Sequence, residues 1–242
     1  RPPRSTPLYS SAASDVYKRQ DKRRKTYAAM VSAVDDGVGR ILDQLESLEI
    51  VDNTIVFFFS DNGGPESKNG SDNGPLREGK SSIYEGGNRV PFAMQWTSEI
   101  SQMVYDYPIS SLDILPTIAE LTNSPIEENN ELDGVNIIPF LKGSKKGRPH
   151  PTLYIRKFDE DLYSVRDGDM KLVIKEKNTV KELYNLDKDI GEENNLADFF
   201  PQEVRRLDSI LQTWDAQLID PVFLGLIHTE GWQKRLNKTS KK

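Results

Sequence analysis

The sequence of 242 residues has no cysteine and only two histidines, which excludes several kinds of site. Without cysteine there can be no disulfide bond and no cysteine-ligated zinc site. The histidines, His150 and His228, are isolated in the sequence, and neither has the spacing of a metal-ligand pair. Because His150 lies between two prolines, we expect it to be a surface residue rather than a catalytic base.

Long apolar runs are also missing. No stretch is long enough to cross the hydrocarbon core of a bilayer, so we expect no membrane span. Lysine and arginine number 32 against 38 acidic residues, and the net charge of −6 argues against a nucleic-acid partner. The hydrophobic share of 36% and the charged share of 29% are typical of a globular protein, and the length allows one or two domains.

The most informative segment is an apolar run that ends abruptly in polar residues. Residues 55–59 read Ile-Val-Phe-Phe-Phe, which predicts a strand buried on both faces. Residues 60–64 then read Ser-Asp-Asn-Gly-Gly, so Asp61 and Asn62 stand at the carboxyl end of the strand, where open α/β sheets bind ligands. Their oxygens are hard ligands of the type that Ca²⁺ or Mg²⁺ takes. The simpler alternative is a structural Asx turn.

A second segment matches a nucleotide-binding pattern in letters but not in context. Residues 74–81 satisfy the P-loop pattern G-x-x-x-x-G-K-[ST]. A P-loop must follow a strand directly and open a helix, whereas residues 67–73 are polar and rich in turn formers. A helix starting after Ser81 would meet Gly86, Gly87 and Pro91. We therefore disfavour a P-loop NTPase.

The order of elements in the first part of the chain predicts an α/β fold. Apolar residues at helical spacing predict a helix over about 22–48, and the strand at 55–59 follows it, as in the helix–strand unit of a parallel sheet. A second strand is predicted over 89–96. A short helix is predicted over 111–121, with Ser110 or Ser111 as its N-cap.

The pattern changes after residues 144–151, a charged segment with glycine and proline that suggests a subdomain boundary. Four short runs separated by turn signals predict an antiparallel meander, at 153–156, 162–166, 171–175 and 181–184. Apolar residues at helical spacing over 203–218 predict a helix that covers one face of this sheet.

Several phrases together resemble the sulfatase family. They are Ser-Asp-Asn-Gly-Gly at 60–64, Leu-Arg-Glu-Gly-Lys at 76–80 and Tyr-Glu-Gly-Gly-Asn-Arg-Val-Pro at 84–91, and the resemblance extends in order over roughly residues 25–215. It implies the C-terminal half of an alkaline-phosphatase-like domain with a mixed or parallel sheet, followed by a small C-terminal antiparallel α+β subdomain. It also implies a sulfuric ester hydrolase that acts on a sulfate ester, for instance an aryl sulfate or a sulfated glycan.

The resemblance assigns roles to three residues. Asp61 and Asn62 would give oxygens to Ca²⁺, and Lys80 would contact the sulfate as a catalytic residue; a solvated loop lysine is the alternative for Lys80. Glu85 and the glycines after it are expected to be structural, because glycine permits positive φ or close backbone approach and Glu85 could pair with an arginine. A periplasmic, extracellular or lysosomal location is implied by the family.

The family nucleophile is a formylglycine formed from a Cys/Ser-x-Pro-x-Arg motif, which we do not find in these residues. The loose candidate Ser5-Thr6-Pro7-Leu8-Tyr9 has tyrosine in place of the arginine. We therefore expect a truncated and inactive chain: a non-native or disordered tail at 1–20 without signal-peptide character, part of the catalytic domain at 21–150, the subdomain at 151–220, and a tail at 221–242. A phosphodiester or phosphonate monoester hydrolase of the same superfamily and a non-catalytic binding fragment remain alternatives.

Overall fold

The computed structural model describes residues 22–124, 126–127, 130–175 and 179–222. The predicted tail at 1–20, and all but two residues of the tail at 221–242, lie outside this range. The chain forms two compact units, which we describe separately. The first unit comprises Arg1–Asp72 and Val90–His150, and the second comprises Asn73–Arg89 and Pro151–Lys242.

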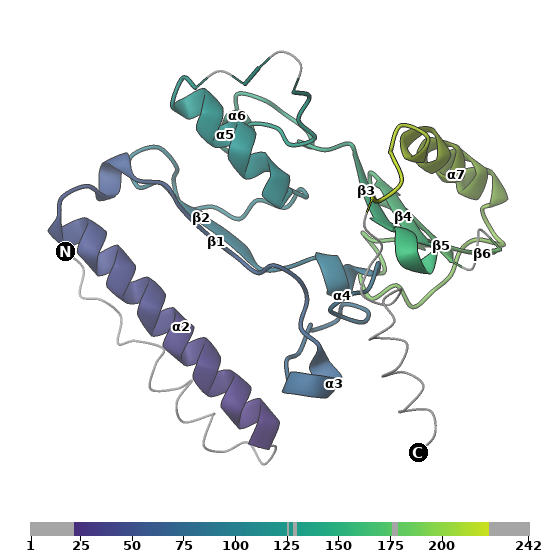
Figure 1. Cartoon of the computed structure of the whole chain (residues 1–242), viewed down its shortest axis with the longest axis horizontal. Helices are drawn as coiled ribbons and strands as arrows, with labels where there is room; N and C mark the ends of the chain where they lie inside the picture. The colour runs from purple at the N-terminus through teal and green to yellow at the C-terminus, as the bar shows by residue number, and fades with distance from the viewer. Residues whose placement is uncertain (1–21, 125, 128–129, 176–178, 223–242) are drawn as a thin grey trace. The chain divides into compact units, whose positions relative to one another are not determined.

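A long helix opens the described part of the first unit. Helix α2 spans Lys22–Ser47 (Figure 1), which confirms the helix predicted from the apolar spacing. None of its residues is buried, and apolar side chains such as Val34 and Ile41 are exposed. Its first turn is tied to the loop after β1, because the guanidinium of Arg24 donates to the carbonyl oxygen of Gly70 at 2.7 Å. That loop contains the short helix α3, Glu66–Asn69.

Strand β1 (Val56–Phe59) pairs antiparallel with β2 (Phe92–Gln95), with Phe59 opposite Phe92. Both predicted strands are confirmed, and their pairing is compatible with a mixed sheet, although no parallel neighbour lies among the residues described. The expectation that β1 is buried on both faces is wrong for this part of the chain, since Phe58 and Phe59 are 45% and 40% exposed. The reason is that β2 is the single strand paired with β1 in the described ranges.

The rest of the first unit contains short helices joined by a capped turn. The 3₁₀ turn η2 (Ser111–Asp113) leads into α5 (Ile114–Leu121), and α6 follows at Ile138–Leu141. Ser110 is confirmed as the N-cap: its hydroxyl accepts from the Leu112 amide, while the Asp113 carboxylate accepts from the Ser110 amide at 2.7 Å.

His150 is not the surface residue that its flanking prolines suggested. Its side chain is 9% exposed, and Nε2 lies 2.7 Å from Oδ1 of the buried Asp113. The same carboxylate oxygen accepts from the Val135 amide at 2.8 Å. A carboxylate that is buried needs such partners, so this contact ties the end of the first unit to the start of α5.

The second unit is built on a four-stranded antiparallel meander, as the sequence predicts. Its strands pair in chain order, namely β3 (Thr152–Lys157), β4 (Leu162–Asp167), β5 (Met170–Lys175) and β6 (Val180–Asn185). Helix α7 (Pro201–Asp215) covers one face (Figure 1), and its Leu207 and Leu211 join a buried cluster with Val165, Leu172 and Leu183. Burial of this apolar face holds sheet and helix together.

The other side of the sheet is packed by a segment from much earlier in the chain. Ile83 and Tyr84 form a second buried cluster with Val173, Tyr184 and Leu186. Residues 73–89, which the sequence reading grouped with 21–150, therefore belong to the second unit. This segment contains the short helix α4, Glu85–Asn88.

No helix among the described residues is long and apolar enough to span a membrane.

Candidate functional site

The predicted metal ligands stand directly after β1, in the first unit. The Ser60 amide donates to the carbonyl oxygen of Pro91 at 3.2 Å, which continues the β1–β2 ladder to the turn. The amide group of Asn62 donates to the carbonyl oxygen of Gly63 at 2.9 Å, so the side-chain oxygen of Asn62 is not used in that bond. Asp61 is exposed. One carboxylate and one amide oxygen are therefore available on consecutive residues after the strand.

The donor chemistry fits a hard cation, but the number of donors is small. Ca²⁺ takes about six to eight oxygen ligands. Within the described ranges, no group of three or more histidine, aspartate or glutamate side chains is placed to hold a metal ion. Asp61 and Asn62 can supply part of a coordination shell, and a complete shell would require further ligands.

Lys80 lies in the second unit, on a tightly shaped loop. Its side chain is exposed, and two non-glycine residues close to it, Glu78 and Ser81, have φ of 61° and 73°. Such left-handed conformations cost energy in residues other than glycine and persist only where surrounding contacts enforce them. The segment does not have the structure of a P-loop: no strand immediately precedes Gly74, and the next helix, the four-residue α4, begins only at Glu85.

Hydrogen bonds to the backbone carbonyls of this loop enforce its shape. The donors come from within residues 73–88 and from β3, and the acceptor carbonyls belong to residues on both sides of Lys80. The pairs are Gly86 N to Arg77 O at 2.9 Å, Asn73 Nδ2 to Glu78 O at 2.8 Å, Ser82 N to Gly79 O at 2.9 Å, Lys157 Nζ to Ser81 O at 2.8 Å, and Asn88 Nδ2 to Ser82 O at 2.8 Å.

The glycines of α4 form the platform on which this loop lies. A Cβ added to Gly86 would sit 2.3 Å from the carbonyl oxygens of Arg77 and Glu78, and one added to Gly87 would sit 2.4 Å from that of Ser82. These contacts are too close for any side chain. The prediction that these glycines serve close backbone approach is thus confirmed.

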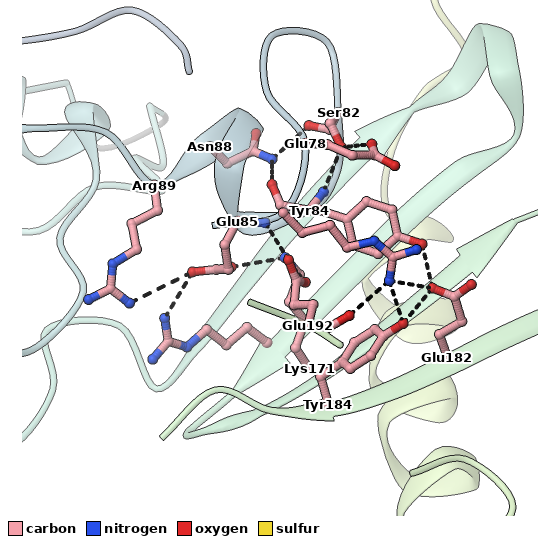
Figure 2. Close-up of polar contacts among 12 residues, drawn as sticks. Glu78, Ser82, Tyr84, Glu85, Asn88, Arg89, Lys171, Glu182, Tyr184 and Glu192 are labelled. Carbon is pink, nitrogen blue, oxygen red and sulfur yellow. Dashed lines mark hydrogen bonds and ion pairs between the residues drawn. The ribbon is translucent and has the colours of Figure 1, made fainter. Parts of the chain in front are cut away.

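A buried ion-pair triad lies beneath α4 (Figure 2). The Lys171 ammonium lies 2.9 Å from Glu85 Oε1 and 2.8 Å from Glu192 Oε1, and the Glu85 amide donates to Glu192 Oε2 at 2.7 Å. Lys171 and Glu192 are 1% and 0% exposed. Burial raises the pKa of Glu192, and the Lys171 ammonium counteracts part of that rise.

The predicted arginine partner of Glu85 is also present. Arg89 and Arg166 lie 3.9 and 3.8 Å from Glu85 Oε2, so the prediction is confirmed, although Lys171 is the closer partner. Sequence reasoning missed Lys171 and Glu192, which lie on β5 and in the loop after β6. The one signal in the sequence was that Lys171 lies in a largely apolar strand, where a charged residue that becomes buried needs a partner of opposite charge.

Arg77 anchors the start of the Lys80 loop to the sheet. Its guanidinium lies over the Tyr84 ring, 3.9 Å from the centroid, and donates to Tyr184 Oη at 2.8 Å and to the Glu192 carbonyl oxygen at 2.9 Å. Tyr184 in turn donates to Glu182 at 2.8 Å. Burial and the Glu182 carboxylate raise the pKa of Tyr184, which keeps its hydroxyl protonated as a donor.

The consecutive residues Asp61 and Asn62 lie in the first unit, and Lys80 lies in the second. Each part has its own chemistry: hard oxygens at the end of β1, and an exposed lysine on a loop whose backbone is hydrogen-bonded. That the three side chains act on one ligand stays a prediction.

Comparison with known proteins identifies the family. The profile described as Sulfatase matches residues 1–124, a range that includes the predicted tail at 1–20. The chain is 32% identical to the uncharacterized sulfatase YdeN of Escherichia coli over 83% of its own length and 43% of that protein. It thus spans less than half of this curated relative.

Solved structures agree. The protein Ps i-CgsB, in complex with k-i-k-neocarrahexaose, matches with a TM-score of 0.81 and 30% identity over 100% of this chain and 55% of that one. The phosphonate monoester hydrolase of Agrobacterium radiobacter matches with a TM-score of 0.63 and 23% identity over 80% and 41%, which shows the shared fold. The segments described above and these matches place the chain in the sulfatase family, with its alkaline-phosphatase-like fold.

Proposed function

We propose that this chain supplies part of the catalytic domain of a sulfuric ester hydrolase, with Lys80 as the residue that contacts the sulfate group. The observation that carries the proposal is the loop around Lys80, whose backbone is held by left-handed residues and by hydrogen bonds to its carbonyls, so that an exposed lysine extends from a defined point of the chain. A sulfate ester develops charge on its oxygens as it reacts, and a fixed cation stabilises that charge without reorganisation during the reaction.

Asp61 and Asn62 are proposed as oxygen donors to Ca²⁺. When bound there, the ion would polarise the sulfate oxygens as a Lewis acid. The two side chains would orient the ion at the end of β1, and the Asn62 bond to the Gly63 carbonyl would fix which side-chain atom faces it. A nucleophile of the Cys/Ser-x-Pro-x-Arg type is not contained in these residues, so the proposed activity belongs to a longer polypeptide that carries this chain.

The substrate class that we propose is a sulfated glycan. Support comes from the neighbour that was crystallised with k-i-k-neocarrahexaose, whose fold matches over the whole of this chain. Aryl sulfates are the second candidate within the same chemistry. A polymeric glycan would be met outside the cytoplasm, so we propose a periplasmic, extracellular or lysosomal site of action.

A phosphodiester hydrolase or a phosphonate monoester hydrolase is the second candidate function. It is favoured by the structural match to the phosphonate monoester hydrolase, and the same oxygens and ammonium would suit a phosphonate. The match establishes the fold alone, whereas the sequence relatives carry sulfatase names, so we place the sulfate ester first.

The test requires a longer protein, expressed from the same reading frame, that has about the length of the relatives. Release of inorganic sulfate from carrageenan oligosaccharides and an aryl sulfate, and hydrolysis of a phosphonate monoester, are measured in parallel. We expect sulfate release that Lys80→Ala lowers by about 10²–10³-fold in kcat, the usual loss for one preorganised stabiliser. Lys188→Ala, an exposed lysine of the same unit, is the matched control and retains full activity. Faster turnover of the phosphonate, or an unaffected Lys80→Ala enzyme, would refute the proposal.

A further inference from the structure

The Lys80 loop, residues 77–82, is attached to the sheet through α4 rather than standing alone. Its backbone rests on Gly86 and Gly87, where any side chain would collide with the carbonyl oxygens of the loop. The loop keeps its shape only while α4 remains seated, because the Gly86 amide that binds the Arg77 carbonyl belongs to this helix. What holds α4 therefore also holds Lys80.

Helix α4 is a single turn and cannot be stable by itself. Its first residue, Glu85, is fastened by both its backbone and its side chain: the amide donates to Glu192, and the carboxylate binds Lys171 (Figure 2). Glu192 contributes a second fastening, because its carbonyl oxygen accepts from Arg77 at 2.9 Å. Glu192, in the loop after β6, therefore binds both α4 and the start of the Lys80 loop.

The triad is costly to bury, so its presence calls for an explanation. Charges removed from water are stabilised only by close partners, and apolar residues of similar size often stabilise a core as well or better. Here the triad fixes one orientation of α4, since Lys171 reaches two carboxylates at once. We propose that Glu85, Lys171 and Glu192 are positioning residues for Lys80, which set the place at which its ammonium meets an anionic group. This inference rests on the role proposed above for Lys80.

Two variants of the 242-residue chain separate this role from simple stability. Glu192→Gln removes one charge but leaves Lys171 paired with Glu85, so no buried charge is left without a counterion. Gly86→Ala leaves the triad intact and displaces the loop directly, because the new Cβ would lie 2.3 Å from two loop carbonyl oxygens. Glu193→Gln, at the exposed neighbouring position, and Gly37→Ala, where a Cβ meets nothing within 4 Å, are the matched controls.

Hydrogen exchange measured by mass spectrometry reports the loop and the sheet separately. We expect both variants to exchange about tenfold faster or more in peptides covering 76–88, while peptides of β5 and β6 keep their protection. The controls should leave both regions unchanged. Loss of protection in loop and sheet together in both variants, or no change in the loop of either, would overturn the inference.

Acetylation of lysines with and without inorganic sulfate tests the link to the anion. Sulfate should slow acetylation of Lys80 relative to Lys188 in the wild-type chain, by about twofold when half the sites are filled, and this protection should be lost in Glu192→Gln and Gly86→Ala. Equal protection in variants whose loop has loosened would overturn the positioning role and leave the function of Lys80 standing. An absence of protection in the wild type would instead refute the proposed sulfate contact, and the exchange data alone would then decide whether the triad fastens the loop.

Discussion

At the scale of single residues, the charged side chains fall into two groups. Some are exposed and can bind a ligand, and others are buried and already paired within the fold. Asp61 and Lys80 are exposed, whereas Asp113, Lys171 and Glu192 are buried and paired. Charged residues that are exposed at strand ends and on shaped loops are available for binding, and buried pairs maintain the structure around them. Position in the fold, rather than residue type, decides which acidic or basic side chain is free to act.

The small number of oxygens at the end of β1 leads to a prediction about calcium. We expect the 242-residue chain to bind Ca²⁺ with a Kd above about 10⁻⁴ M, because one carboxylate and one amide fill only part of the shell of six to eight ligands. Asp61→Asn should weaken binding further, and Asp106→Asn, at another exposed position, should not. Titration calorimetry checks this. Submicromolar binding would show that a complete site exists within these residues.

At the scale of elements, the N-terminal half of α7 is joined to the meander by charge as well as by apolar packing. Arg206 binds both Glu203 oxygens at 2.6 and 2.9 Å and reaches Asp167 at the end of β4 at 2.6 Å. These hydrogen bonds from Arg206 lower the pKa of Glu203. A carboxylate with a lowered pKa stabilises the folded state above its unfolded pKa, and this stabilisation disappears as pH falls through the folded value.

The corresponding prediction concerns acid stability. Glu203→Gln should lower the free energy of unfolding of the second unit at neutral pH. Between neutral pH and about pH 3, the free energy of unfolding of this variant should fall less than that of the wild type, because the carboxylate that takes up a proton is gone. Urea unfolding at several pH values measures the effect, followed by tryptophan fluorescence in a background where Trp96 and Trp232 are replaced by phenylalanine, so that Trp214 on α7 is the reporter. Glu193→Gln serves as control and should keep the wild-type pH dependence. An identical slope for Glu203→Gln and the wild type would contradict the assignment.

At the scale of the whole molecule, the two units differ in how much of their apolar surface they cover. The second unit has two buried clusters, one under α7 and one under residues 83–84. In the first unit, α2 has no buried residue, and apolar side chains of α2 and β1 are exposed. A strand and a helix that both expose apolar side chains favour association between molecules.

We therefore expect the isolated chain to associate, and limited proteolysis to cut it unevenly. Early cuts should fall in residues 1–25 and in the loop at 63–72, while residues 151–218 persist as a protected fragment. The segment 73–89 should remain bound to that fragment through Tyr84 and Glu85 even after cleavage. Size-exclusion chromatography of the digest tests this. A monodisperse monomer with uniform protection over 26–220 would contradict the prediction.

The last prediction is that the 242-residue chain by itself releases no sulfate from an aryl sulfate or a carrageenan oligosaccharide. The reason is that the nucleophile motif is not found: the chain has no cysteine, and its loose candidate at residues 5–9 lacks the arginine. Charge stabilisation without a nucleophile leaves at most a trace of rate above background, with no burst. Ion chromatography of sulfate, with and without added Ca²⁺, provides the measurement. Turnover that depends on Ca²⁺ would show that a nucleophile is present after all.

Local patterns in the sequence were sufficient for the longer helices and the strands, but not for the one-turn helices α3, α4 and α6. The apolar spacing at 22–48 and 203–218 predicted two helices, and the four short runs after residue 151 predicted the meander, because amphipathic periods of 3.6 and 2 are properties of neighbouring residues. The cap at Ser110, the glycine platform at 86–87 and the phrases that carry the family resemblance are likewise local. So are the positions of Asp61, Asn62 and Lys80, the candidate site residues.

Only the tertiary structure decided which of these segments support one another. Residues 73–89 pack on a sheet that begins more than sixty residues later, and the triad joins Glu85 to Lys171 and Glu192 across separations of 86 and 107 residues. The burial of His150 against Asp113 across 37 residues is another example. Such contacts depend on complementary burial and charge between distant surfaces, which leave no periodic trace in the chain. For that reason the sequence indicates the candidate side chains, and the fold shows which distant contacts shape the loop that carries Lys80.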